Sequence, residues 1–157
     1  FENRGRRQAE QVMVMRDLWT QDSLDFEGEF HRIDKASINP RPEESIPIWF
    51  GGSAPALIER VARLGDGWMP LMGANEKAAE CIRKIREARE REGKNMDGFG
   101  IQAQAQYKGG TPDIWKKNAT SWCEMGATHI AIATHNAGVT DVPGHLSRVE
   151  EYLKAVQ

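Results

Sequence analysis

The chain has 157 residues, 39% of them hydrophobic, and a formal net charge of −2. This length and apolar content suit one folded domain, residues 1–157, with a core of its own. The small negative charge argues against a nucleic-acid-binding surface, and the apolar runs are too short to span a membrane. With no charged-then-apolar segment at the start, we expect a cytoplasmic protein.

Residues 1–45 are expected to form a helix, a small hairpin and a connector. Apolar residues recur at helical spacing over 7–19. Apolar positions within 24–33 flank a turn around Gly28, which indicates two short antiparallel strands. The two prolines within 39–42 then favour an extended connector, because a proline disfavours helix in the residue before it.

Residues 46–157 alternate between strand patterns and helix patterns. The expected strands are short apolar or alternating runs, at 46–50, 67–70, 99–107 and 128–134. A segment of helical periodicity follows each of them, and three of these helices have typical starting residues, which are Pro55, Asn75 and Thr111. The resulting α/β order predicts parallel strands joined by right-handed crossovers.

Two architectures fit four such strand-helix units. A doubly wound, flavodoxin-like sheet is complete with four or five strands, whereas a closed (β/α)8 TIM barrel needs eight strands and about 250 residues. Length alone favours the doubly wound sheet. The order of the strands separates the two, since half a barrel pairs sequential strands and a doubly wound sheet reverses direction.

Several segments, taken in order, resemble the luciferase-like monooxygenase family. They are Arg4-Gly5-Arg6-Arg7, Glu10-Gln11, Leu18-Trp19-Thr20, Phe26-Glu27-Gly28-Glu29-Phe30, Asn39-Pro40-Arg41-Pro42, the run 47–53 and the run 63–68. Their order and spacing are more specific than any single piece. The resemblance implies a (β/α)8 barrel, of which this chain would be the C-terminal half, strands five to eight.

The resemblance also implies an oxidoreductase or monooxygenase that acts on a small molecule with coenzyme F-420, which we prefer, or FMN. Because half a barrel leaves its outer strands unpaired, we expect a homo-oligomer or a missing N-terminal half to complete it. The chain is then a fragment that is inactive by itself. The alternatives are a catalytically inactive half-barrel that self-associates and a small flavodoxin-like phosphate-binding module.

The strongest candidate site is Gly51-Gly52-Ser53-Ala54, at the carboxyl end of the first expected strand of the parallel set, where barrels place their sites. Two glycines let the backbone approach an anion closely, and the amides and dipole at a helix start favour negative charge. The expected ligand is the cofactor phosphate, which the resemblance places at this junction. A tight turn without a ligand is the alternative.

Further candidates follow the other strands. Trp68 and Met69 are expected to line the flavin or substrate pocket, with a core position as the alternative. Tyr107, His135 and Asn136 are expected substrate-pocket residues, because they come directly after the third and fourth strands. No pair of residues has metal-ligand spacing, and no catalytic residue is identified. The two cysteines are expected to be buried free thiols.

Overall fold

Four parallel strands, each followed by a helix, form the main body of the computed structural model, which describes residues 2–157. The strands are β3 (Trp49–Gly51), β4 (Gly67–Met69), β5 (Gly100–Gln106) and β6 (His129–Ala133). The helices are α2 (Pro55–Leu64), α3 (Glu76–Arg91), α4 (Pro112–Glu124) and α5 (Val142–Val156). Before them lie helix α1 (Arg4–Thr20) and an antiparallel pair, β1 (Leu24–Glu27) and β2 (Arg32–Ala36).

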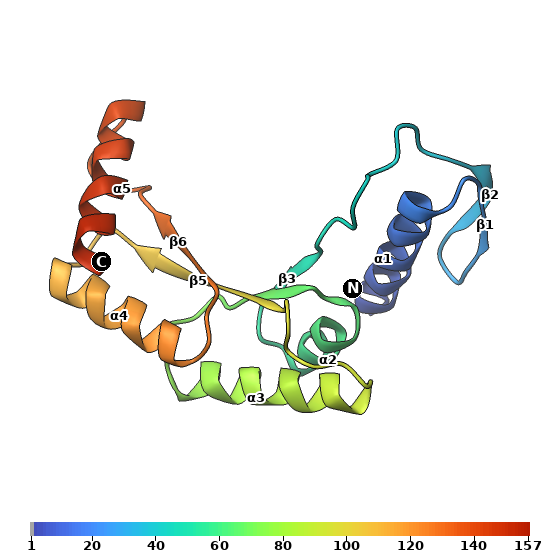
Figure 1. Ribbon diagram of the computed structural model, residues 1–157, viewed down its shortest axis with the longest axis horizontal. Coiled ribbons are helices and arrows are strands. Elements are labelled where there is room, and N and C mark those ends of the chain that lie inside the picture. The colour runs from blue at the N-terminus through green and yellow to red at the C-terminus, as the bar shows by residue number, and fades with distance from the viewer. Residues whose placement is uncertain (1) are drawn as a thin grey trace.

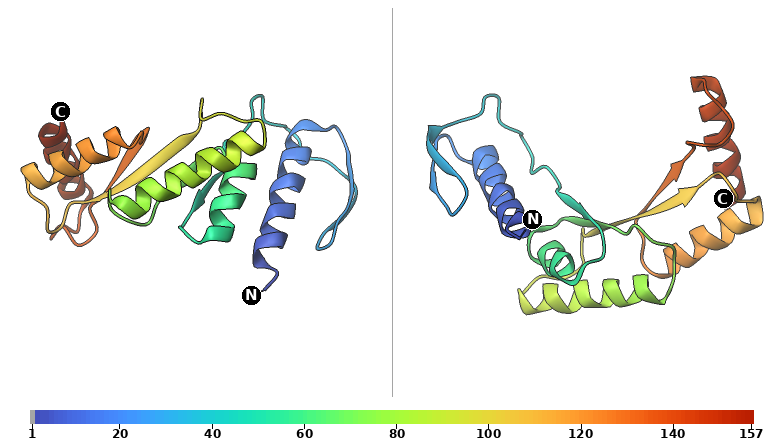
Figure 2. Two further views of the ribbon diagram at one scale, coloured as in Figure 1. Left: turned by 90° about the horizontal axis from the view of Figure 1, so that it is seen from below. Right: turned by 180° about the vertical axis from the view of Figure 1, so that it is seen from behind.

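The strands are hydrogen-bonded in the order β3-β4-β5-β6, and each is parallel to its neighbour. This sequential order is that of a barrel segment, so the half-barrel prediction is confirmed and the flavodoxin-like alternative is wrong. Helices α2, α3 and α4 lie on one face of the sheet (Figure 1), and α1, α2 and α3 lie side by side (Figure 2). None of the helices among residues 2–157 covers the other face, which we call the open face.

Some boundaries differ from those expected, for local reasons. The strand expected at 46–50 begins only at Trp49, because the backbone N–H of Ile48 donates to the carboxylate of Asp66 rather than to a strand. The first helix begins at Arg4 rather than near residue 7. The hairpin turn occupies 28–31, where the side chain of Glu10 binds the backbone.

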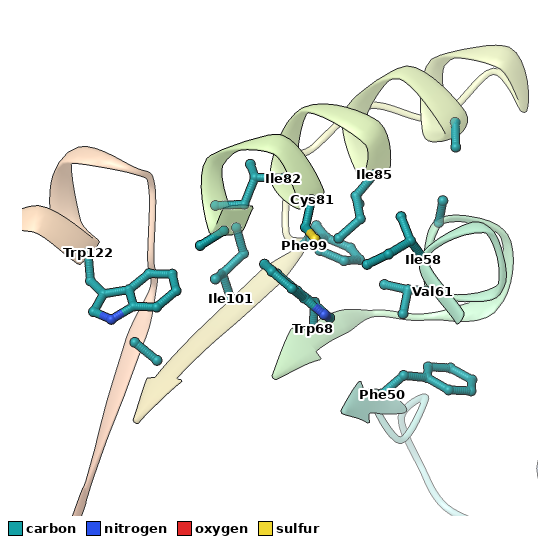
Figure 3. Close-up of a cluster of buried hydrophobic side chains, with 14 of the residues drawn as sticks. Phe50, Ile58, Val61, Trp68, Cys81, Ile82, Ile85, Phe99, Ile101 and Trp122 are labelled. Carbon is teal, nitrogen blue, oxygen red and sulfur yellow. The ribbon is translucent and has the colours of Figure 1, made fainter. Parts of the chain in front are cut away.

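The main core lies between the sheet and helices α2 and α3. Phe50, Trp68 and Ile101 are the helix-facing residues of three neighbouring strands, and all are buried. Figure 3 shows the Trp68 ring among Ile58 and Val61 of α2 and residues of α3 and β5. Fully burying a large apolar side chain stabilises a fold by about 1.5–3 kcal/mol, so this cluster holds α2 and α3 against the strands.

The indole of Trp49 lies across the open face at the amino ends of the strands. Gly67 and Gly100 are its partners in register on β4 and β5, and a Cβ on either one would overlap the indole ring. The ring extends far enough to meet that of His129 on β6, at a centroid distance of 5.3 Å in an edge-on arrangement. One side chain therefore spans all four strands, and two glycines make room for it.

A buried carboxylate attaches the hairpin to α1. Glu10 is 7% exposed, and its two oxygens accept the backbone N–H groups of Glu29, Phe30 and His31 at 2.7–2.9 Å. Nδ1 of His31 lies 2.8 Å from Oε1 of Glu10. A Cβ on Gly28 would lie 2.5 Å from Cδ of Glu10, so glycine at this position permits the contact.

We predict that Gly100→Ala lowers the free energy of unfolding by about 1–3 kcal/mol, because the added methyl overpacks the site that Trp49 fills. Urea denaturation measures the change. Gly73→Ala is the matched control, since a Cβ there meets no atom within 4 Å. In a Trp49→Ala background the effect of Gly100→Ala should largely vanish, and an undiminished effect would show that Trp49 is not the obstacle.

We predict an acid-sensitive attachment of the hairpin. Burial raises the pKa of Glu10, but the hydrogen bonds from His31, Phe30 and Glu29 outweigh it and lower the pKa below 4.5. A carboxyl whose pKa is lower in the folded chain stabilises the fold above its unfolded pKa, and this contribution is lost as the pH falls through the folded pKa. When the pH is lowered below 4.5, the free energy of unfolding should therefore fall more steeply in the wild-type protein than in the Glu10→Gln variant.

Urea midpoints measured at a series of acidic pH values test this prediction. Glu150→Gln is the control, because the Glu150 side chain is exposed on α5 and makes no hydrogen bond in the described structure. It should leave the acid dependence as in the wild type. Equal acid dependence in all three proteins would contradict the role assigned to Glu10.

Candidate functional site

Residues 51–54 connect β3 to α2 at the carboxyl end of the sheet, and we call them the β3–α2 junction. Gly52 has φ +120°, a conformation that side chains rarely allow, so this position requires glycine. A Cβ on Gly51 would meet nothing nearer than the carbonyl oxygen of Met69, at 3.8 Å. Packing of the protein itself therefore does not explain the glycine at position 51, and the space above it is open to a ligand.

Helix α2 begins without a capping side chain. Its N-cap is Ala54, whereas Asn75, Thr111 and Asp141 cap α3, α4 and α5 with side-chain oxygens that accept backbone N–H groups. The hydroxyl of Ser53 makes no hydrogen bond in the described part of the chain. The first amides of a helix have no partner within it, and an anion satisfies them well. Pro55 has no N–H, and the N–H of Leu57 donates to the carbonyl oxygen of Ala54 at 2.8 Å. The N–H groups of Ser53, Ala54 and Ala56 have no partner in the described part of the chain, and they are the free donors of the junction.

Trp68 supports the junction from within the core. Its side chain has no exposed surface, and its Nε1 donates to the carbonyl oxygen of Gly52 at 2.7 Å. The backbone N–H of Gly52 also donates to Met69, at 3.2 Å. The sequence pattern placed Trp68 at the pocket wall, whereas the structure places it behind the junction. Met69 lies beside Gly51 on the open face.

Tyr107, His135 and Asn136 lie away from the junction, at the ends of β5 and β6. The hydroxyl of Tyr107 donates to Glu151 of α5 at 2.6 Å, and its ring packs on Trp115 with centroids 4.9 Å apart. Tyr107 therefore belongs to the helix layer. His135 and Asn136 are exposed in the turn after β6, where Asn136 has φ +63°.

The hydrogen bond with Glu151 is the main cause that raises the pKa of Tyr107, and burial adds to it. The same bond is the main cause that lowers the pKa of Glu151. Both shifts favour the observed arrangement, a protonated phenol that donates to a carboxylate. A tyrosine held in this way positions the end of β5 against α5 rather than serving as a free proton donor.

The open face carries amides that were not singled out as site residues. Gln102, Gln104 and Gln106 alternate along β5 with the buried Ile101, Ala103 and Ala105. None of the three glutamine side chains makes a hydrogen bond in the described structure. The alternation of glutamine with apolar residues is visible in the sequence, and it indicates that the two faces of this strand differ. It does not indicate which of the two faces lies at a binding site.

Asp66 has a structural role at the opposite end of the strands. Its Oδ2 accepts from Nη2 of Arg16 at 2.7 Å and from the backbone of Ile48 at 2.9 Å. Its carbonyl oxygen accepts the N–H of Gly100. This network fixes α1 and the starts of β3 and β5 to one loop.

The two cysteine thiols differ in their burial, whereas both were expected to be buried. Cys81 is buried and burial raises its pKa, but Cys123 is exposed on α4, so the prediction of two buried thiols is wrong for Cys123. Among residues 2–157 there is no group of three His, Cys, Asp or Glu side chains that could hold a metal ion. None of the described helices is long and apolar enough to cross a membrane.

Sequential parallel strands, each followed by a helix, define part of an α/β barrel. A family model described as "luciferase-like monooxygenase" matches residues 1–108. The chain belongs to this family. It is also 33% identical, over 131 residues, to the F-420-dependent glucose-6-phosphate dehydrogenase of Mycolicibacterium gilvum. That match covers 82% of this chain and 39% of the relative.

Solved structures share the fold. An F-420-dependent secondary alcohol dehydrogenase, solved with an F-420-acetone adduct, superposes with a TM-score of 0.60 at 20% identity. The match covers 97% of this chain and 53% of that one. The F-420-dependent tetrahydromethanopterin reductase of Methanopyrus kandleri superposes with a TM-score of 0.54 at 16% identity, covering 93% of this chain and 53% of that one. The chain therefore has the fold of about half of a luciferase-like barrel.

We predict that Trp68→Phe loosens the junction. The variant keeps a ring but removes the donor to Gly52, so it should cost about 1 kcal/mol more than a matched loss of volume alone. Trp122→Phe is the match, because Trp122 is equally buried and its Nε1 has no partner. Hydrogen exchange at the Gly52 amide should quicken in Trp68→Phe only. Equal exchange rates in the two variants would count against a positioning role.

Proposed function

We propose that the protein is an F-420-dependent oxidoreductase in which the β3–α2 junction holds the cofactor phosphate. The observation that carries this proposal is the uncapped start of α2, preceded by a glycine in the φ > 0 region. The open space above Gly51 fits a group that approaches the backbone closely. No carboxylate lies within residues 51–54 to oppose an anion.

Each part of the junction has a distinct role in this proposal. The unpaired N–H groups of Ser53, Ala54 and Ala56 and the hydroxyl of Ser53 donate to the phosphate. Gly51 and Gly52 let the backbone come close, and Ala54 places no side chain over the helix start. Trp68 fixes the Gly52 carbonyl from behind and acts as a positioning residue. Met69 forms the apolar wall beside Gly51.

Coenzyme F-420 is preferred over FMN, because the relative at 33% identity is an F-420-dependent dehydrogenase. When bound, this deazaflavin supplies hydride chemistry, while the protein supplies binding, orientation and exclusion of water. We therefore propose hydride transfer with a small alcohol-type substrate rather than oxygen transfer. His135 and Asn136, exposed after β6, remain proposed substrate contacts.

The two outer strands of the sheet, β3 and β6, indicate how the active protein could be completed. β3 and β6 each have a neighbour on one side only, and such edges pair readily with further strands. We propose that four more strand-helix units, from a preceding segment or from a second copy, close the barrel before catalysis occurs. An inactive half-barrel that self-associates is the second candidate, and the same unpaired edges favour it.

Binding of F-420, compared with its phosphate-free deazaflavin-ribitol fragment, tests the phosphate anchor. The protein should bind F-420 at least about tenfold more tightly than the fragment, because several charge-assisted hydrogen bonds are lost without the phosphate. In Gly52→Ala and Ser53→Ala this preference should shrink, whereas Ser147→Ala, on the exposed side of α5, should keep it. An unchanged preference in Gly52→Ala would place the phosphate elsewhere.

Anaerobic incubation tests the type of reaction. Hydride transfer should reduce F-420 in the presence of an alcohol substrate without oxygen, with loss of the visible absorbance of the deazaflavin. A requirement for oxygen would contradict it and favour the monooxygenase reaction. Binding without turnover in either condition, together with self-association, would favour the inactive half-barrel.

A further inference from the structure

A pocket of about 420 Å³ lies between the loop that follows β4 and the first turns of α4. Residues of β5 form one wall of it, and no residue of the β3–α2 junction lines it. No carboxylate lines it either, and its one charged side chain is that of Lys108. This pocket is therefore separate from the proposed phosphate anchor, with β4 between the two.

The early end of β4 exposes the backbone of β5 to this pocket. β4 pairs with β5 only through Gly67 with Gly100 and Trp68 with Ile101, whereas β5 continues to Gln106. The N–H of Tyr107 donates to Ala133 of β6, and the carbonyl oxygen of Ile101 accepts from Thr128, just before β6. The N–H of Gly100 instead donates to the carbonyl oxygen of Asp66, just before β4. A parallel strand alternates in this way, so the backbone groups of Gln104 and Gln106 point toward the pocket.

Two buried polar atoms of pocket residues have no hydrogen-bond partner among residues 2–157. Trp115 is 4% exposed, and its Nε1 makes no hydrogen bond. Oδ1 of Asn118, one turn further along α4, is also buried and unpaired. An unpaired buried polar group costs about 1–3 kcal/mol, so a polar ligand that pairs with both atoms would gain free energy from them.

Two glycines, Gly109 and Gly110, lie beside the indole nitrogen of Trp115 and separate it from the pocket. Nε1 of Trp115 lies so close to Gly110 that a Cβ there would overlap it, and Gly109 has φ +77°. Access of a ligand to the indole nitrogen requires this short segment to shift, and the two glycines have no side chains to displace. Leu71, 70% exposed, and Ile114, 55% exposed, add an apolar edge to the pocket.

We propose that this pocket binds a small hydroxylated organic anion. Hydroxyl groups both donate and accept, which matches the indole N–H of Trp115, the amide oxygen of Asn118 and the backbone groups of β5. The acidic group would pair with the ammonium of Lys108, and the carbon chain would contact the apolar edge. That this ligand is the substrate rests on the proposed function, but its binding does not.

Indole N–H signals in ¹H–¹⁵N NMR spectra of the protein test the proposal without any cofactor. The probes are D-gluconate, D-sorbitol, which has the same kind of hydroxylated chain without the acid, and hexanoate, which has the acid without hydroxyls. Gluconate should move the Trp115 signal, which Trp115→Phe identifies. The Trp122 signal is an internal control, because its Nε1 is also buried and unpaired but lies outside the pocket.

Two variants assign the contacts. Asn118→Leu should weaken gluconate binding about fivefold, the effect of one hydrogen bond of about 1 kcal/mol. Lys108→Gln should reduce gluconate binding to that of sorbitol. Lys117→Ala, on the outer side of α4, should leave both probes unaffected, and the Trp122 signal reports whether each variant is folded.

Three results would overturn the proposal: no shift of Trp115 with either hydroxylated probe, equal shifts of Trp115 and Trp122, or a response to hexanoate equal to that of gluconate. Gluconate binding that persists in a protein unable to bind F-420 would support the pocket while refuting the proposed function. F-420 binding tests the proposed function, and gluconate binding tests this pocket, so the two proposals can fail separately.

Discussion

The hydrogen bond from the indole of Trp68 to the carbonyl of Gly52 links the core of this protein to its candidate site. The ring is fully buried between the sheet and helices α2 and α3. Its one polar atom finds its partner in the loop that begins α2. The same ring that fills the core therefore also holds the backbone of the junction in place at Gly52.

The open face is organised by a second aromatic side chain. Trp49 occupies the amino ends of the strands, where the glycines at 67 and 100 accept its ring. Farther along β5 the same face presents glutamine amides. The face is thus filled at one end by a large side chain and left polar at the other, where barrels bind their ligands.

The alternation of strand and helix patterns along the chain explains why the sequence alone was enough to predict the α/β class. The strands and helices alternate, and local signals such as Asn75 and Thr111 at helix starts act over three or four residues. Such signals are readable without tertiary contacts. Glycines before α2 likewise marked the junction, because the requirement for φ > 0 at Gly52 is a property of the backbone. The ordered family segments added the barrel, which length alone argued against.

Tertiary structure decided which side of each short strand carries which role. In strands of three residues, such as β4, alternation cannot show whether Trp68 or Met69 faces the helices. The early end of β4, and with it the pocket beside Trp115 and Asn118, depends on the divergence of two strands far apart in sequence. The contact of Trp49 with Gly100 likewise joins residues from different strands. These features arise from packing between distant segments, which local sequence patterns do not encode.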